Sequence, residues 1–546
     1  MKKVKEKEKF RLRPDMLAKG ELIAISILIA TFFPVIRMSG VMCASFLTIP
    51  VILYIFMCGV FLIGFERSVY KMVVFRIKRD QYQNAADLFK RAMLVAFVVS
   101  LVIIALLAFF AGNIMNGIYH MERGYIVLWL ILPGILFISV QGCIRGYLHG
   151  MGYTIQNFVS MIILSVTSIA STVILSFFAN SYGVKVNALL HVDYISRFYT
   201  ACVCMISFSI GALISLIYIT SFYETKKKEI AIYIKTGATK FLDSKLEVFD
   251  NLKYSLPVMI VTFALWIIDV ALYVMSVAKE GTDALVLSDL GVLTGKVLPV
   301  ILIATFLLLL TIIKKWYQMD AAFKIDKKDI AAILFGQILH STIRTFIPVA
   351  VFIMFTADIV QEVIYGASDQ GEASLLAFSS LLCIALSLFI FLQWFVIRLE
   401  HAALNFIGLG IYFGVTLLLS VIMILGMGRG LHAIVLSFGI AMLVYDFVFF
   451  KLISTMLDFS FDDLYRPVVV IVASIVSGVV ALILKSALRY VIGEILTLAA
   501  CLIVSYVVYV MILAFMRGIE RYSLSKLPLG NFFIKLTNMS SRRISE

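Results

Sequence analysis

The sequence alternates between long apolar stretches and short polar segments over most of its length. A helix needs about 20 apolar residues to cross the roughly 30 Å hydrocarbon core of a bilayer. Backbone groups in lipid must be hydrogen-bonded within their own segment, which favours helices at this length. The pattern therefore predicts an all-α chain with about fourteen membrane-spanning helices. Their approximate ranges are 21–39, 41–65, 88–112, 125–144, 155–179, 198–222, 254–278, 288–313, 331–356, 373–397, 402–425, 431–455, 467–484 and 491–516.

One polar-to-apolar stretch occurs twice. Residues 81–119 and 327–365 align without a gap at a fixed offset, 331 − 85 = 246. Both copies share an Ala-Ala pair, a Leu-Phe pair, a long apolar run and a closing Ile-Tyr. The sequence Pro-Val-Ile-Leu precedes each copy, at Pro50 and at Pro299. Two halves of like plan indicate a transporter built from internal repeats.

Composition agrees with a bilayer as the solvent. Of the 546 residues 62% are hydrophobic and only 15% are charged, and the mean hydropathy is +1.03. A water-soluble chain of this length could not bury so much apolar surface. The seven cysteines, which lie in or beside apolar segments, lack metal-ligand spacing. They are interpreted as small buried hydrophobes.

The net charge of +14 is explained by where the cations lie. Lys and Arg concentrate in segments 1–20, 66–91, 223–253, 314–328 and 517–543, whereas the intervening loops carry few, and loop 357–372 is acidic. Cytoplasmic loops are enriched in cations, so both termini are predicted to be cytoplasmic. This distribution argues against nucleic acid as the partner of the positive charge.

The two repeats then share one orientation, which predicts a pseudo-two-fold along the membrane normal. We expect two six-helix lobes and two extra C-terminal helices. The predicted divisions are a basic N-terminus 1–20, a first lobe 21–222, a basic linker 223–252, a second lobe 253–456, the extra helices 457–516 and a basic tail 517–546. The linker is too short for a soluble domain and is expected to be a surface helix or tether.

The most patterned stretch is 141–157, QGCIRGYLHGMGYTIQN. Its glycines, Gly142, Gly146, Gly150 and Gly152, favour close helix approach or a sharp turn. Arg145 lies among them. Two interpretations stand side by side: Arg145 contacts substrate, or it snorkels to the interface above a tight turn.

This stretch resembles a motif of the polysaccharide and lipid-linked oligosaccharide flippases, in the multidrug/oligosaccharidyl-lipid/polysaccharide exporter superfamily. The lipid II and sporulation flippases belong to that branch. Residues 66–94 and 252–273 are similar to its second-span exit with third-span start and to the beginning of its second lobe. The resemblance implies fourteen spans and the export of a lipid-linked saccharide. The arginine set that marks lipid II transporters does not map cleanly onto this chain.

Ionisable side chains inside predicted spans are costly unless they are paired or hydrated. Arg37, Lys296 and Arg344 are interpreted as lining a wet cavity between the lobes and binding a diphosphate, a task suited to cations. Asp269 and Asp446 could bind a coupling cation, Na⁺ or H⁺. The competing interpretation is structural: Asp269 pairs with Lys296, and Asp446 hydrogen-bonds locally.

No catalytic constellation, nucleotide-binding loop or metal-ligand spacing is present in the sequence, so a transporter without a cofactor is expected rather than an enzyme. The predicted function is alternating-access movement of a lipid-linked saccharide, a peptidoglycan or polysaccharide precursor, from the inner to the outer leaflet of a bacterial plasma membrane. A monomer is expected. The alternatives are a multidrug/cation antiporter of the same superfamily and a polyprenyl-phosphate glycosyltransferase or polymerase.

Overall fold

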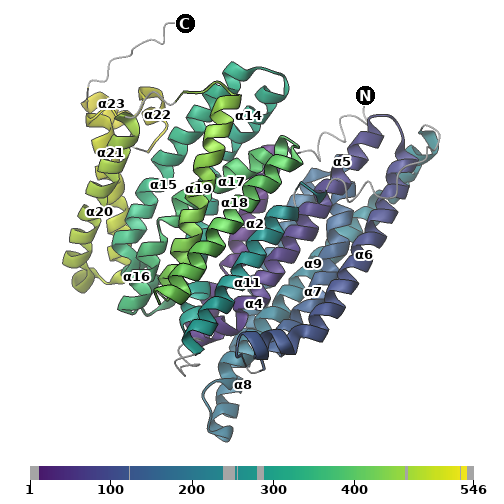
Figure 1. Ribbon diagram of the computed structural model, residues 1–546, viewed down its shortest axis with the longest axis horizontal. Coiled ribbons are helices and arrows are strands. Elements are labelled where there is room, and N and C mark those ends of the chain that lie inside the picture. The colour runs from purple at the N-terminus through teal and green to yellow at the C-terminus, as the bar shows by residue number, and fades with distance from the viewer. Residues whose placement is uncertain are drawn as a thin grey trace. The chain divides into compact units, whose positions relative to one another are not determined.

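The computed structural model describes residues 12–121, 123–237, 252–254, 256–278, 288–428, 430–460, 465–528 and 530–537. All regular structure in these ranges is helical (Figure 1). Fourteen helical segments are long and apolar enough to span a membrane, which confirms the predicted count and the all-α class. Residues 238–251 of the predicted linker lie outside the described residues.

The chain divides into two compact units. Unit 1 comprises the chain up to Pro299 together with Gln393–Ala441, and unit 2 comprises Val300–Leu392 together with Met442 to the C-terminus. These boundaries differ from the predicted lobes, whose limits stay a prediction.

Unit 1 begins with the helices of the first six spans. They are α2 (Pro14–Ile29), α3 (Phe32–Ser39), α4 (Val41–Cys58), η1 (Gly59–Phe65), α5 (Glu66–Ile77), α6 (Tyr82–Gly112), η2 (Asn113–Ile118), α7 (Gly124–Gly150), α8 (Thr154–Leu190) and α9 (Ile195–Thr236). It continues with α11 (Leu256–Ala278), η3 (Val292–Val297), α18 (Ala402–Ser420) and η4 (Val421–Gly426). The η segments are π-helical turns, in which the hydrogen-bond spacing widens and side chains rotate relative to an α-helix.

Unit 2 contains α14 (Ile313–Lys324), α15 (Lys328–Tyr365), α16 (Gln370–Ser379) and α20 (Tyr465–Ile492) to α23. Three further helices cross a unit boundary: α13 (Leu298–Leu309), α17 (Leu382–Arg398) and α19 (Leu431–Met456). The last elements are α21 (Glu494–Phe515), α22 (Arg521–Ser525) and α23 (Gly530–Leu536).

The sequence repeat is visible in the backbone. Asp80 and Asp326, 246 residues apart, both adopt the left-handed conformation with φ of 57° and 58°. The next residues, Gln81 and Lys327, precede α6 and α15 with nearly equal angles, φ −86°, ψ 56° and φ −89°, ψ 71°. Aspartate tolerates the left-handed region better than most side chains. The two copies therefore begin their helices with the same turn.

A second pair of residues at the same offset is in direct contact. The hydroxyls of Thr48 on α4 and Thr294 on η3 lie 3.0 Å apart, and both side chains are buried. Residues that occupy equivalent positions in two repeats meet only near the axis that relates the repeats. This contact within unit 1 is thus the expected result of a pseudo-two-fold duplication.

One predicted loop is largely helical. The acidic segment 357–372 belongs mostly to α15, which continues to Tyr365 beyond non-helical angles at Thr356, and only 366–369 connects it to α16. The loop interpretation of this segment was wrong because a change from apolar to polar composition ends a membrane span without ending a helix. In the same way α9 extends to Thr236, past the predicted end of its span, so the first part of the predicted linker is helical.

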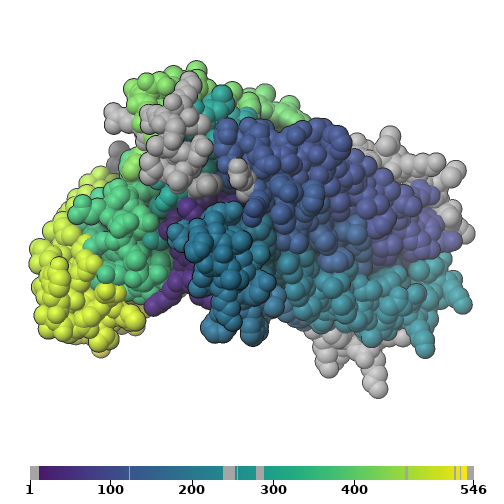
Figure 2. All heavy atoms as spheres, turned by 90° about the horizontal axis from the view of Figure 1, so that it is seen from below, coloured from purple at the N-terminus to yellow at the C-terminus, as the bar shows by residue number. Residues whose placement is uncertain are grey.

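In unit 2, the helices beyond the twelfth span form their own packed cluster. Buried residues of α20 and α21, such as Val469, Val510 and Leu513, contact Leu524 and Phe533 of the C-terminal segment. Figure 1 shows α22 and α23 at the end of the α20–α21 pair opposite α16. The α20–α21 pair also packs against α15, and Figure 2 shows their yellow atoms beside green atoms of the α15–α16 region.

Candidate functional site

The largest cavity described in unit 2 lies among α14, α15, α20, α21 and the segment after α21. Its volume is about 850 Å³. One wall follows a single face of α15, where His340, Arg344, Pro348 and Phe352 recur every four residues. This face changes from basic to apolar along the helix, so the cavity is amphipathic. We call it the unit 2 cavity.

Four cations and one carboxylate line the basic end of this cavity. The cations of the described lining are Lys315, Arg344, Arg466 and Lys526, and its carboxylate is Glu520. Arg466 Nη1 contacts Glu520 Oε1 at 2.8 Å. With His340 neutral, four positive charges and one negative charge give these lining residues a net charge of 4 − 1 = +3.

Lys315 and Arg344 are half-buried, and the hydrogen bonds shown for them are to neutral groups. Lys315 Nζ donates to Ser341 Oγ at 2.8 Å and to the Gln337 carbonyl at 3.5 Å. The backbone carbonyl of Arg344 accepts a hydrogen bond from the Tyr509 hydroxyl at 2.8 Å, which ties α15 to α21. Among the described residues, neither cation forms an ion pair with a carboxylate.

The pKa of Lys315 reflects the charges around it. Lys315 lies in α14, outside the membrane-spanning segments. Burial lowers this pKa, and the positive charges of Arg344 and Lys526 lower it further, whereas Glu520 raises it. An ammonium group among like charges is stabilised by any anion that enters. The cavity end is therefore suited to an anionic group.

The other predicted substrate-binding cations lie in unit 1. Arg37 is exposed near the end of α3. Lys296 is buried in the π-helical turn η3, with 5% of its surface exposed. Arg344, in unit 2, is the predicted cation that lines a described cavity. Whether Arg37 and Lys296 bind substrate stays a prediction.

The two predicted coupling carboxylates are both buried. Asp269 on α11 is fully buried and Asp446 on α19 is 5% exposed. Neither carboxylate accepts a hydrogen bond that the described structure shows, although Ser420 lies beside Asp269. The expected local hydrogen bond of Asp446 is thus not seen. A buried carboxylate without donors favours a bound proton or cation.

Arg145 lies in a buried polar network of unit 1. Its guanidinium is fully buried and lies 2.9 Å from Glu66 and 3.5 Å from Glu21. Glu66 also accepts from Asn157 at 2.9 Å and lies 3.2 Å from His149. The network joins α2, α5, α7 and α8. Both carboxylates approach the same guanidinium nitrogen, Nη2, and the side chain is buried rather than snorkelling. Whether Arg145 contacts substrate stays a prediction.

The glycines beside Arg145 face η1 and α5. A Cβ at Gly142 would lie 2.1 Å from the Phe61 carbonyl oxygen, and one at Gly146 or Gly150 would meet Val69 or Val73 within 2.8 Å. Gly152, with φ +97°, forms the turn into α8 and has open space around it. These contacts position α7, and with it Arg145, against its neighbours.

A second cluster of charges joins the C-terminal part of α20 to the C-terminal part of α15. Lys485 Nζ lies 2.7 Å from Asp358, and Arg489 contacts both Asp358, at 3.2 Å, and Glu362. Asp358 and Glu362, two of the acidic residues of the predicted loop, are therefore helix residues paired with cations of the thirteenth span.

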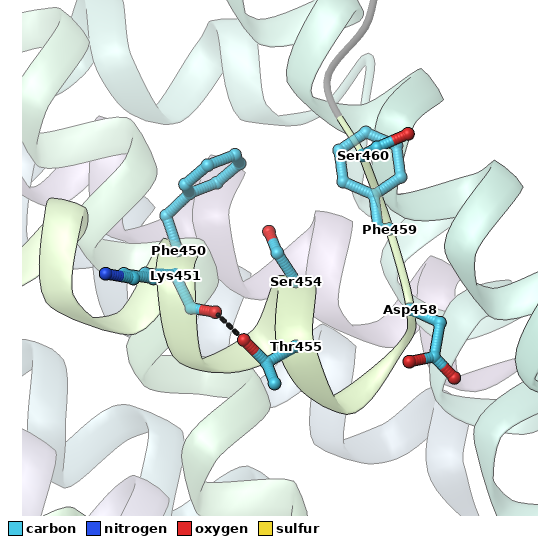
Figure 3. A pocket seen from close by; sticks show the side chains of 7 residues that line it. All are labelled: Phe450, Lys451, Ser454, Thr455, Asp458, Phe459 and Ser460. Atoms are coloured by element: carbon cyan, nitrogen blue, oxygen red, sulfur yellow. Dashed lines mark hydrogen bonds between the residues drawn. The ribbon is translucent and has the colours of Figure 1, made fainter.

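A smaller open pocket of about 430 Å³ lies at the end of α19. In Figure 3, Lys451 and Asp458 point away from each other, and the hydrogen bond drawn is local, from Thr455 Oγ1 to the Lys451 carbonyl at 2.9 Å. Its polar groups do not converge on one point. This pocket lacks the charge concentration of the unit 2 cavity.

Comparison with solved structures shows which fold the chain shares. The lipid II flippase MurJ in an inward closed conformation matches with a TM-score of 0.57 at 14% identity, covering 90% of this chain and 96% of that chain. An inward-facing multidrug resistance MATE transporter matches with a TM-score of 0.54 at 14% identity, covering 81% and 94%. The chain has the fold of the MOP superfamily of transporters. A MOP superfamily transporter from Pyrococcus furiosus, described as having a binding pocket of reverse polarity, matches with a TM-score of 0.51 at 12% identity, covering 82% and 98%.

No protein-family model matches the sequence, and no curated protein is a significant match. The MOP fold and the fourteen apolar helices indicate a multi-pass membrane protein. The fold agrees with the family resemblance of the motif at 141–157.

Sequence reasoning missed three residues of the unit 2 cavity: Lys315, Arg466 and Lys526. Lys315 and Lys526 were counted among loop cations, because positive charge near a span end is ordinary in a membrane protein, and Arg466 was not singled out. One signal was available. His340 and Arg344 share a helical face, and a basic face must find an anion or water. The partner elements, however, are remote in sequence.

Proposed function

We propose that the chain moves an amphipathic, anionic lipid-linked saccharide from the inner to the outer leaflet of a bacterial plasma membrane. The observation that carries this proposal is the amphipathic unit 2 cavity, with a net charge of three at one end and apolar walls beyond. A drug-sized cation would be repelled by that end. A lipid with a charged headgroup matches both ends.

The physical task is to carry a polar, charged headgroup past about 30 Å of hydrocarbon. The lipid tail stays in an apolar environment along α15, α20 and α21. Arg37 and Lys296 are proposed to supply further cations to the headgroup during the transfer. Both termini are proposed to be cytoplasmic, and the protein is proposed to act as a monomer.

Energy for outward movement comes from a gradient or from the membrane potential. Export of each negative charge from a negative-inside cell gains about 2.3 kcal/mol per 100 mV. Asp269 and Asp446 are proposed to bind a coupling cation, since each is a buried carboxylate without a hydrogen-bond donor in the described structure.

The test is depletion of the protein in its own cell, followed by extraction of lipids. The expected result is accumulation of one polyprenyl-diphosphate-linked saccharide in the inner leaflet, reversed by the wild-type gene and not by a variant with Arg344→Gln and Lys315→Gln. Unchanged levels of every lipid-linked precursor would contradict the proposal.

The alternative is a multidrug/cation antiporter, favoured by the buried carboxylates and by the likeness to MATE transporters. Truncation after residue 460 separates the two. An antiporter retains transport of a small organic cation without the last two spans, whereas the proposed flippase loses the wall of its cavity and its activity.

A further inference from the structure

We infer that the basic end of the unit 2 cavity is a binding site for the phosphate of a lipid, and that the chain's own C-terminal segment completes it. The phosphate is held by Lys315, Arg344 and Lys526, and one hydrocarbon chain lies along the apolar face of α15. This deepens the proposed function, because the transported lipid is one of two molecules with this chemistry. The other is a resident anionic phospholipid.

Charge balance is the first argument. Glu520 lies 2.8 Å from Arg466, and no other carboxylate is among the described lining residues. Within the described ranges, the hydrogen-bond partners of Lys315 are a hydroxyl and a carbonyl. Cations kept close together beside a membrane require an anion, and a phosphate offers several acceptor oxygens to converging ammonium and guanidinium groups.

Direction is the second argument. On α15 the cavity face runs from His340 and Arg344 to Val349 and Phe352, and the opposite wall on α21 runs from Tyr509 to Leu502. Because α21 runs antiparallel to α15 along this cavity, both walls become apolar toward the same end. A ligand aligned with them has its charge at one end and its hydrocarbon at the other.

The C-terminal segment is the third argument. Glu520, Lys526 and Leu527 follow the last span and line the cavity. The segment is fixed there by Leu524 in the apolar cluster and by hydrogen bonds from Tyr465 to Met516, 2.8 Å, and from Tyr506 to Pro528, 3.3 Å. A tail that is only a solubilising extension would not be anchored across the cavity mouth.

The experiment measures lipid binding to the purified full-length protein in phosphatidylcholine nanodiscs by native mass spectrometry. The probes are a polyprenyl monophosphate, the neutral polyprenol of the same length, phosphatidylglycerol and inorganic phosphate. Wild type is compared with the double variant Lys315→Gln/Arg344→Gln and with Lys526→Gln. Lys314→Gln is the matched control, since Lys314 is the exposed neighbour outside the lining.

We expect the double variant to bind the phosphorylated lipid at least about tenfold more weakly, and Lys526→Gln to bind it several-fold more weakly, from the loss of charge-assisted hydrogen bonds. Lys314→Gln is expected to bind as wild type does. The charge-conserving Lys315→Arg/Arg344→Lys retains most of the affinity, which separates loss of charge from loss of folding.

Equal binding of polyprenol and polyprenyl phosphate, or equal affinity in wild type and the double variant, would overturn the site. Displacement of the lipid by equimolar inorganic phosphate would overturn the lipid part of it. Tighter binding of polyprenyl phosphate than of phosphatidylglycerol supports a transport site, and the reverse supports a resident lipid. Charge-dependent binding without precursor accumulation in depleted cells retains the site and rejects the transport proposal.

Discussion

At the scale of single residues, the molecule uses buried charge in two contrasting ways. Arg145 is fully buried, and Glu66 and Glu21 compensate its charge, so it contributes to helix packing. Lys315 and Arg344 are half-buried and form no ion pair with a carboxylate of the described residues, so they retain attraction for an anion. The same residue types thus differ in role according to the charges beside them.

The lowered pKa of Lys315 gives a pH dependence. Lys315 faces Arg344, Lys526, Glu520, Arg466, His340 and Tyr509 across the cavity. Because burial and like charges lower its pKa, it loses its proton at a lower pH than an ordinary lysine, and anion affinity falls as pH rises through that range. A bound phosphate opposes this loss.

The measurement is a titration of polyprenyl phosphate binding against alkaline pH. Lys315→Arg, which stays protonated, is expected to bind nearly independently of pH over the range where wild type weakens. Parallel curves for the two proteins would show that Lys315 does not contact the phosphate.

The Arg145 network predicts an unequal response to its single and double variants. Arg145→Met leaves Glu66 buried with no cation in contact and is expected to cost about 3–5 kcal/mol of stability. Arg145→Met/Glu66→Gln removes both charges and is expected to recover most of the loss. Thermal unfolding in detergent measures both, and a double variant as unstable as the single one would contradict the pairing.

At the scale of elements, close helix approach depends on small residues. Gly142 lies so near the Phe61 carbonyl that a methyl group would require α7 and η1 to separate. Glycine at a membrane helix contact commonly allows such approach. The glycine spacing was readable from the sequence, but the helix that it faces was not.

Gly142→Ala is therefore expected to lower the unfolding temperature, with a cost of about 1–3 kcal/mol from overpacking. Gly410→Ala on α18 is the matched control, since its added methyl meets nothing within 4 Å and alanine favours a helix. Equal behaviour of the two variants would mean that α7 does not pack against η1 as described.

At the scale of the whole molecule, positions 246 residues apart in the sequence have matching features. The turns at Asp80 and Asp326 and the contact between Thr48 and Thr294 all share the offset of 246 residues. Internal repeats of this kind are common in transporter folds, and they agree with the proposed function.

Thr48→Cys/Thr294→Cys is expected to form an intramolecular disulfide on mild oxidation, because the two hydroxyls are 3.0 Å apart. The cross-link is detected by mass spectrometry of proteolytic fragments, with each single cysteine variant as the control. If transport requires α4 and η3 to part, oxidation will stop it and reduction will restore it. Failure to cross-link would place the repeat axis elsewhere.

The sequence by itself determined the fourteen spans, the all-α class, the duplicated plan and the resemblance to MOP flippases, because hydrophobic length and local periodicity are written in consecutive residues. Only the tertiary structure decided which charges meet. Arg145 pairs with Glu66 and Glu21. Much of the predicted acidic loop is helix, whose carboxylates pair with Lys485 and Arg489. Lys315, Arg344 and Lys526 line one cavity. Those contacts join residues about 30 to more than 200 positions apart, and no local pattern specifies which distant side chains share a space.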